Sequence, residues 1–183
     1  MEDERAIEYL SRAIKLKDSW GCLVQRSSCY QNLGNYKAGA ADLETYIKGH
    51  PERITADICR SLGHAYCLSN NQTKGVEYLS RALAMDPKIA KVHMWRAEAY
   101  MKLKDYKAAA DDLTAALKDL QDPELYSRRI ECYRLMGRAD LVAKDKAALS
   151  HLNADAFEIA PFRTVNGDSQ RIKESANRPK PTK

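Results

Sequence analysis

Apolar and polar residues alternate along this chain with the period of an amphipathic α-helix. In the first segment the apolar residues recur at intervals of three and four, at Ala6, Leu10, Ala13 and Ile14. This spacing lines up side chains along one face of a helix, and it returns on both sides of a turn between Leu103 and Leu117. Proline is tolerated at the start of a helix, and prolines separate the periodic segments at Pro51, Pro87 and Pro123. The pattern predicts an all-α chain of short helices joined by turns.

The helical segments also repeat one another in sequence. Residues 30–38 read YQNLGNYKA, and residues 100–108 read YMKLKDYKA. Residues 7–14 read IEYLSRAI, and residues 76–83 read VEYLSRAL. The first pair is offset by 70 residues, which corresponds to roughly two units of 34 residues with a short insertion. We therefore expect an array of similar helical hairpins.

These residues resemble the tetratricopeptide repeat family, whose unit is a helix–turn–helix of about 34 residues. The repeats fall at 20–51, 56–87, 90–121 and 123–154, after an unpaired second helix at 3–17. One tyrosine recurs in every full repeat, as Tyr30, Tyr66, Tyr100 and Tyr133. The resemblance implies a right-handed superhelix, or solenoid, of about four and a half hairpins at 1–155. The last repeat departs most from the pattern, with Ile130 at a small position and Lys146 at an apolar one, so we expect its second helix to pack loosely or to shift in register.

Charged residues stand at two positions that pack together in such a hairpin. The first holds Arg26, Arg96 and Arg129 in three repeats and Leu62 in the fourth. The second lies sixteen residues later and holds Asp42, Asp112 and Asp145, with Tyr78 in the copy that has Leu62. A buried guanidinium needs a carboxylate partner, because an unpaired buried charge is strongly destabilising. We predict salt bridges within each of the three repeats; an anion site built on the arginines is the alternative.

The resemblance places the first helix of each hairpin along a concave groove. The candidate partner-binding residues on these helices are Arg60, His64, Lys91, Met94, Trp95, Glu98, Lys102, Arg128 and Arg134. This surface is mixed in charge, with an apolar island at Met94, Trp95 and Met101. A tryptophan within a charged rim suits a binding hot spot, because it buries a large area at low entropic cost. The alternative is that Trp95 packs against the next hairpin as part of the core.

Some family members grip the carboxylate at the end of a chaperone tail with lysine, asparagine and arginine at five groove positions. In the first register these positions hold Gly21, Gln25, Ser61, Lys91 and Trp95. One repeat later they hold Asp57, Ser61, Trp95, Glu124 and Arg128. Only Lys91 fits the first register and only Arg128 the second. This mismatch argues against chaperone tails as partners.

The chain lacks the residue patterns of the common catalytic and metal sites. It has no HExxH, no Gly-rich phosphate loop and no GxSxG. Its five cysteines form no CxxC and do not cluster with the histidines, which argues against zinc. His64 and Cys67 are three residues apart on one predicted helix, a spacing that permits contact but does not indicate catalysis. We therefore predict a protein without enzymatic activity, cofactor or metal.

Charge is concentrated at the C-terminal end. The 183 residues carry a net charge of +5, and residues 163–183 contribute six basic and two acidic side chains to it. We expect a short apolar segment at 156–162, folded back over the last helix, followed by a disordered basic tail. Binding of nucleic acid or an anionic surface by this tail is a weaker interpretation, because residues 1–162 carry a net charge of only +1.

The leading hypothesis is a scaffold that binds a peptide or helix of another protein in its groove. The alternative is a structural segment that self-associates through the unpaired helix at 3–17, whose apolar stripe includes Ile7, Leu10 and Ile14. No apolar run is long enough to span a membrane, and no signal peptide is visible. These absences favour a cytoplasmic location.

Overall fold

The computed structural model describes residues 2–16 and 20–159, with side chains described as far as Leu152. In these ranges it contains α-helices and a single 3-10 turn (Pro51–Arg53), and no strand. The helices are α1 (Glu2–Lys15), α2 (Trp20–Asn32), α3 (Tyr36–Gly49), α4 (Ala56–Leu68), α5 (Gln72–Met85), α6 (Ala90–Lys102), α7 (Tyr106–Ala116), α8 (Pro123–Leu135) and α9 (Ala139–Ile159). The all-α prediction is confirmed.

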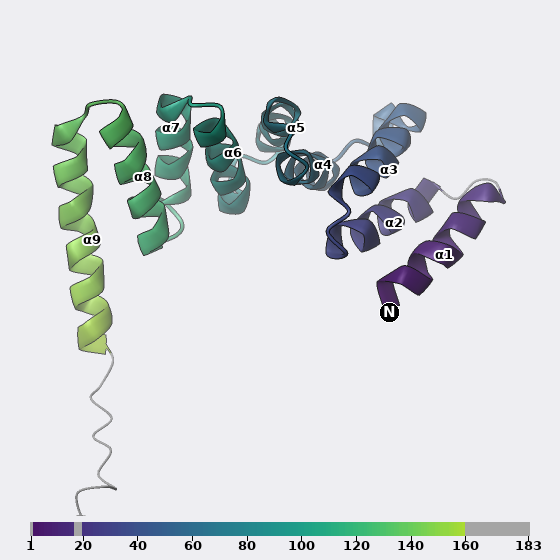
Figure 1. Cartoon of the computed structure of the whole chain (residues 1–183), viewed down its shortest axis with the longest axis horizontal. Coiled ribbons are helices and arrows are strands. Elements are labelled where there is room, and N and C mark those ends of the chain that lie inside the picture. The colour runs from purple at the N-terminus through teal and green to yellow at the C-terminus, as the bar shows by residue number, and fades with distance from the viewer. Residues whose placement is uncertain (1, 17–19, 160–183) are drawn as a thin grey trace, which may run out of the picture.

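Neighbouring helices pair as hairpins, and the hairpins stack in chain order (Figure 1). The pairs α2–α3, α4–α5, α6–α7 and α8–α9 each make one hairpin, and α1 packs against α2 as a helix without a partner before it. Contacts run almost entirely between neighbours along the chain, as expected of a quasi-one-dimensional repeat array. The described part of the chain is therefore a helical-repeat solenoid.

The turn inside each hairpin has the same construction. One residue adopts a left-handed backbone conformation, with φ between 64° and 74°, at Gly34, Asn70, Lys104 and Gly137. In three hairpins the next residue caps the following helix, and its side-chain oxygen accepts a backbone hydrogen bond, at Asn35, Asn71 and Asp105. Such caps satisfy N–H groups that have no partner within the helix. The shared construction sets the same antiparallel geometry in each hairpin.

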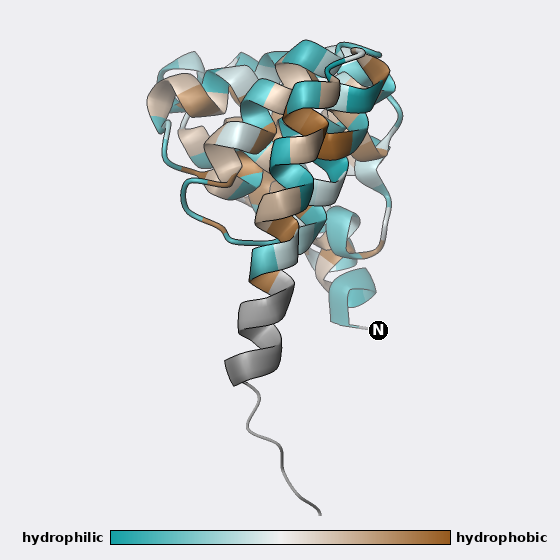
Figure 2. Ribbon diagram, turned by 90° about the vertical axis from the view of Figure 1, so that its left-hand side faces the viewer, coloured by the Kyte–Doolittle hydropathy of each residue, from teal (hydrophilic) through white to brown (hydrophobic). Residues whose placement is uncertain are grey.

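The core is a series of apolar clusters between consecutive helices, and hydrophobic and hydrophilic residues are interspersed along each helix (Figure 2). Leu43, Leu79 and Leu113 recur at one position of the second helices and are each 1% exposed or less. A close helix approach occurs at Gly63, where an added Cβ would lie 2.9 Å from the backbone nitrogen of Leu79. A side chain at this position would force α4 and α5 apart.

The two ends of the array are built differently. In α1 the stripe of Ile7, Leu10 and Ile14 is half-buried, because α1 packs against α2; self-association through this helix stays a prediction. Helix α9 continues to Ile159, so residues 156–159 extend the last helix and do not fold back over it. The predicted tail at 163–183 lies outside the described residues. None of the described helices combines the length and apolarity needed to cross a membrane.

Candidate functional site

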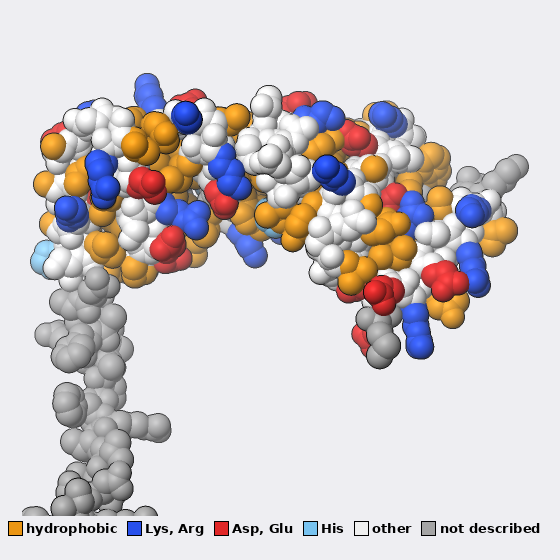
Figure 3. All heavy atoms as spheres, viewed as in Figure 1, with side chains coloured by type: hydrophobic (Ala, Val, Ile, Leu, Met, Phe, Trp, Pro, Cys, Tyr) orange, Lys and Arg blue, Asp and Glu red, His pale blue; other side chains and the backbone are white. Residues whose placement is uncertain are grey.

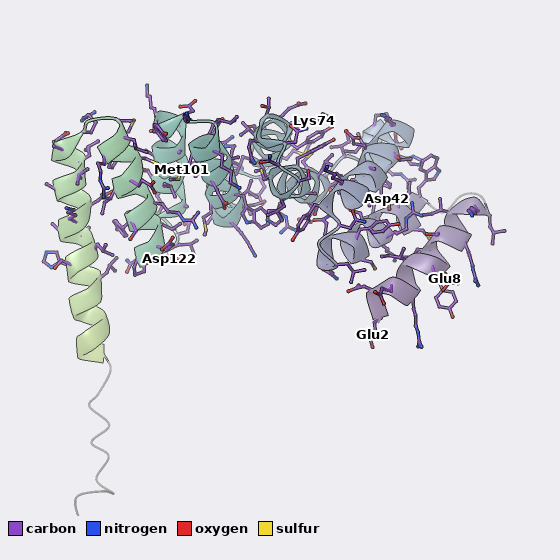
Figure 4. The ribbon with its side chains drawn as sticks, in the orientation of Figure 1. Glu2, Glu8, Asp42, Lys74, Met101 and Asp122 are labelled. Atoms are coloured by element: carbon purple, nitrogen blue, oxygen red, sulfur yellow. The ribbon has the colours of Figure 1, made fainter. Side chains whose placement is uncertain are left out.

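Three arginines of the first helices are held by aspartates of the second helices. Both oxygens of each carboxylate accept hydrogen bonds from one guanidinium, at 2.6 and 2.7 Å for Arg26–Asp42 and at 2.7 Å for both bonds of Arg96–Asp112 and of Arg129–Asp145. The three aspartates are buried; Asp42 on α3 is labelled in Figure 4. Such two-bond pairs fix direction as well as distance. In these three hairpins they therefore fix the orientation of the first helix relative to the second.

Each of these arginines also reaches back to the helix that precedes its own hairpin, α1, α5 or α7. The Nη1 atoms of Arg26, Arg96 and Arg129 donate hydrogen bonds of 2.8–2.9 Å to the hydroxyls of Ser11, Ser80 and Thr114. We call each such set an Arg–Asp–hydroxyl latch. Each guanidinium carbon also lies 5.7 or 5.8 Å from the ring centroid of Tyr30, Tyr100 or Tyr133, four residues later. The latch therefore joins two hairpins as well as the two helices within one.

The junction between α3 and α4 is built differently, because Leu62 and Tyr78 replace the arginine and aspartate of the other repeats. Here Glu44 on α3 stands where the other copies have a hydroxyl. The Tyr66 hydroxyl donates to Glu44, and Lys74 Nζ lies 3.1 Å from both groups. Burial and the neighbouring carboxylate raise the pKa of Tyr66 to about 12. The junction between α3 and α4 is thus also bridged by polar groups, but from another set of residues.

A row of hollows follows the first helices. One of about 70 Å3 lies between α2 and α4, a recess of about 20 Å3 lies between α4 and α6, and one of about 400 Å3 lies between α6 and α8. All three are lined mainly by first helices, and we call the surface that carries them the first-helix face. The largest hollow has Met101 in its lining (Figure 4) and is rimmed by Glu124, Arg128 and Glu131.

Trp95 stands at the middle of this face. Its ring stacks on His64 with centroids 3.8 Å apart and an angle of 18° between the planes. It also packs against the buried cluster around Leu79 and Val92, while Lys91 Nζ lies 5.3 Å from its ring centroid. The half-buried Trp95 therefore serves the core and also lines the recess between α4 and α6. The two interpretations of this residue do not exclude each other.

Charges around Trp95 are largely paired with each other. Glu98 carboxylate oxygens lie 3.4 Å from Lys102 and 3.7 Å from Arg128, which also pairs with Glu124 at 3.0 Å. Arg60 pairs with Asp57 at 2.8 Å. Burial lowers the pKa of His64, and the nearby charge of Lys91 lowers it further, so His64 is neutral at pH 7. The face thus presents a neutral aromatic pair, His64 and Trp95, flanked by partly exposed ion pairs.

The structure brings most, but not all, of the candidate residues together. His64, Trp95, Glu98 and Lys102 line the same recess, and Glu98, Lys102 and Arg128 line the largest hollow. Lys91 joins the set through Trp95. Met94 instead packs against the buried cluster formed by α6, α7 and α8, and Arg134 lines a separate hollow with Arg138 and Lys146. Sequence reasoning missed Gln72, which begins a second helix yet lines the recess.

The thiol of Cys67, which lines the recess between α4 and α6, is not activated. Burial raises the pKa of Cys67 to about 11, so its thiol is protonated at neutral pH and is a poor nucleophile there. Within the described ranges no three His, Cys, Asp or Glu side chains gather in a way that could hold a metal ion. The exposed surface in Figure 3 shows charges of both signs interspersed with hydrophobic side chains.

Comparison with known proteins places this architecture in a family. The pattern of the family described as tetratricopeptide repeat matches residues 69–123, which span the end of α4 to the start of α8. Residues 69–123 are tetratricopeptide repeats, and the other described hairpins have the same construction. This match agrees with the hairpin geometry and with the position of the tyrosine that recurs in every full repeat.

Solved structures of the same fold cover most of the chain. The crystal structure of the MamA protein superposes with a TM-score of 0.80, at 14% identity, over 90% of this chain and 89% of that one. YrrB, described as a tetratricopeptide repeat protein with an unusual peptide-binding site, superposes with a TM-score of 0.73, at 14% identity, over 88% of this chain and 80% of that one. A MamA fragment from Desulfovibrio magneticus gives 0.73 at 16% identity, over 84% and 86% of the two chains. At these identities the likeness concerns the fold.

Proposed function

We propose that this protein is a non-enzymatic scaffold that binds a peptide or helix of a partner protein along its first-helix face. The family as a whole supplies protein-interaction modules. The observation that carries the proposal for this chain is the row of three hollows between α2, α4, α6 and α8, with the stacked Trp95 and His64 at the middle one. The description of YrrB as a protein with a peptide-binding site is consistent with it.

The chemistry of the first-helix face suits an extended segment with one apolar anchor. Trp95, Met101 and the exposed Leu68 supply the apolar surface. Charged side chains around them are exposed enough to exchange their present partners for those of a ligand; the side chains of Lys102 and Glu98 are 48% and 46% exposed. Exposed ion pairs contribute little to folding stability, so such an exchange costs the array little. An apolar centre with a polar rim is the usual anatomy of a protein interface.

Site-specific photo-crosslinking tests the proposal even when the partner's sequence is unknown. A photo-reactive phenylalanine derivative is placed at Met101 or Glu131 on the first-helix face, and at Glu77 or Lys107 on second helices as matched controls. We expect one partner band, identified by mass spectrometry, from the first two positions and none from the controls. The same band from the control positions, or bands from the controls alone, would contradict the proposal.

A further inference from the structure

The last described hairpin departs from the other repeats where its two helices meet. The other three hairpins have a small residue on each helix at this contact: Ser27 and Gly39, Gly63 and Gly75, Ala97 and Ala109. The last hairpin has Ile130 on α8 and Val142 on α9 instead. An added Cβ at Gly39 would lie only 3.0 Å from the carbonyl oxygen of Ser27, so side chains as large as those of Ile130 and Val142 need a wider spacing between the helices.

A hollow of about 330 Å3 lies between these two helices, beside Val142. Ala139, Val142 and Ala143 supply apolar atoms to it from one face of α9. The charged part of the lining, among the residues that the structure describes, is entirely basic: Arg134, Arg138 and Lys146. Small-molecule sites have volumes of about 300–1,000 Å3 and an apolar lining with a few polar groups, and this hollow fits that description at its small end.

Two of the three cations have no counter-ion within the described ranges. Arg138 makes a two-bond pair with Asp140, with hydrogen bonds of 3.0 Å from Nε and 2.8 Å from Nη2. Arg134 and Lys146 make no ion pair with a residue that the structure describes. Three cations against one carboxylate leave a net charge of +2 beside an apolar surface. The hollow is therefore suited to an anionic ligand.

Lys146 occupies the place of a core leucine. Leu43, Leu79 and Leu113 hold this position in the other second helices and are 1% exposed or less, whereas Lys146 is exposed and lines the hollow. If this part of the hairpin served only to pack α9 against α8, leucine would do so better, because it buries apolar atoms without a charge to solvate. The departure of Lys146 from the repeat pattern thus points to a ligand.

We propose that this hollow binds a small amphipathic carboxylate, that is, a molecule with one carboxylate group and a short aliphatic body. The carboxylate accepts two hydrogen bonds from the guanidinium of Arg134, as Asp140 does from Arg138, because the planar groups match. Lys146 adds the second charge, and the aliphatic body lies on Val142. The inference goes beyond the proposed function, since none of the residues that line this hollow lines the three hollows of the first-helix face.

Other occupants fit the charges and the surface less well. A cationic ligand is repelled, and a neutral one leaves Arg134 and Lys146 without a partner. Residues 163–183 of the chain itself carry six basic and two acidic side chains, so like charges oppose their entry. An inorganic anion satisfies the cations but leaves the apolar lining in water. A carboxylate with an aliphatic body meets both requirements at once.

The test is a titration of the full, isotope-labelled chain with hexanoate, followed by heteronuclear NMR. The amide signals of Gly137, Ala139 and Ala143 should shift and saturate. Acetate has the same head without the body, and hexanol has the body without the charge. Each should bind about tenfold more weakly than hexanoate or worse, because the first loses apolar burial and the second a charge-assisted hydrogen bond. Hexylamine should not bind at these residues.

Two kinds of variant place the ligand in the hollow. Arg134→Gln and Lys146→Gln should each weaken hexanoate about tenfold, whereas Lys144→Gln removes the same charge from an exposed neighbour outside the lining and should change affinity less than about twofold. Ala143→Trp, at an exposed helix position, should fill the hollow and abolish binding. Circular dichroism checks that each variant keeps its helices.

The inference is wrong if hexanoate gives no saturable shift at the hollow, or binds no better than hexanol. Equal losses in Lys144→Gln and Lys146→Gln would reduce the effect to overall charge and also overturn it. Tighter binding of hexyl phosphate than of hexanoate would overturn the carboxylate as the recognised group. Trp95→Ala should leave hexanoate affinity unchanged, so failure of this inference and failure of the proposed function are distinguishable.

Discussion

Replacing Asp112 with alanine should lower the free energy of unfolding by about 3 kcal/mol, the low end of the range for breaking a buried ion pair. Asp112 is 4% exposed and accepts hydrogen bonds from Arg96 and an additional contact of 2.8 Å from His93. Its removal leaves the guanidinium of Arg96 facing a buried position with only the Ser80 hydroxyl as partner. Urea titration followed by circular dichroism measures the loss. Asp111→Ala, at the exposed neighbouring position, should change stability by about 0.5 kcal/mol or less.

The chain itself contains the change that should repair this defect. At the junction without the latch, Leu62 stands in place of the arginine and Tyr78 in place of the aspartate, and both pack in the apolar core. The double variant Arg96→Leu/Asp112→Tyr should therefore recover most of the stability lost by Asp112→Ala, because it removes the unpaired charge and fills the same space with apolar atoms. A double variant less stable than Asp112→Ala would contradict the view that the two pairs are interchangeable.

Replacing Trp95 with alanine should weaken binding of the crosslinked partner by about thirtyfold or more, the effect of losing one interface hot spot of about 2 kcal/mol. The indole supplies the apolar centre of the first-helix face, and its loss also frees His64 from its stacked position. The variant should be somewhat less stable as well, because Trp95 packs against the core. Binding is measured by isothermal titration calorimetry at a temperature at which both proteins are folded.

The second tryptophan of the chain serves as the control for this loss. Trp20 begins α2, packs edge-on against His50 at 4.7 Å and is 37% exposed, but it lines none of the three hollows. Trp20→Ala should cost stability and leave the affinity within about twofold. Equal losses of affinity in the two variants would mean that Trp95 acts through folding alone.

The fold could be predicted from the sequence because the same pattern of buried and exposed positions recurs in several repeats. Leu43, Leu79 and Leu113 recur at one helical position, and a pattern repeated in this way identifies which face is buried. The opposition of arginine and aspartate across the hairpin follows likewise from the cost of an unpaired buried charge. Serine and threonine carry no such charge, so the sequence did not single out Ser11, Ser80 and Thr114 as partners of the arginines.

The first-helix face was harder to predict because it depends on how helices approach each other. Met94 stands between two groove candidates in sequence, yet it packs against the buried cluster formed by α6, α7 and α8. Gln72 belongs to a second helix, and only the close packing of α4 against α5 at Gly63 and Gly75 brings it to the recess. The length of α9 also escaped prediction, because the apolar residues at 156–159 fit a helix as well as a separate segment.

Hydrogen–deuterium exchange of the full chain with and without its crosslinked partner, read by mass spectrometry, tests the central claim most directly. If the partner lies along the first-helix face, amides in α4, α6 and α8 should gain protection. Those in α3, α5 and α7 should change little, because these second helices contribute only Leu43 and Gln72 to the lining of the hollows. Protection confined to the second helices, or to α1, would contradict the account and place the interaction surface elsewhere on the array.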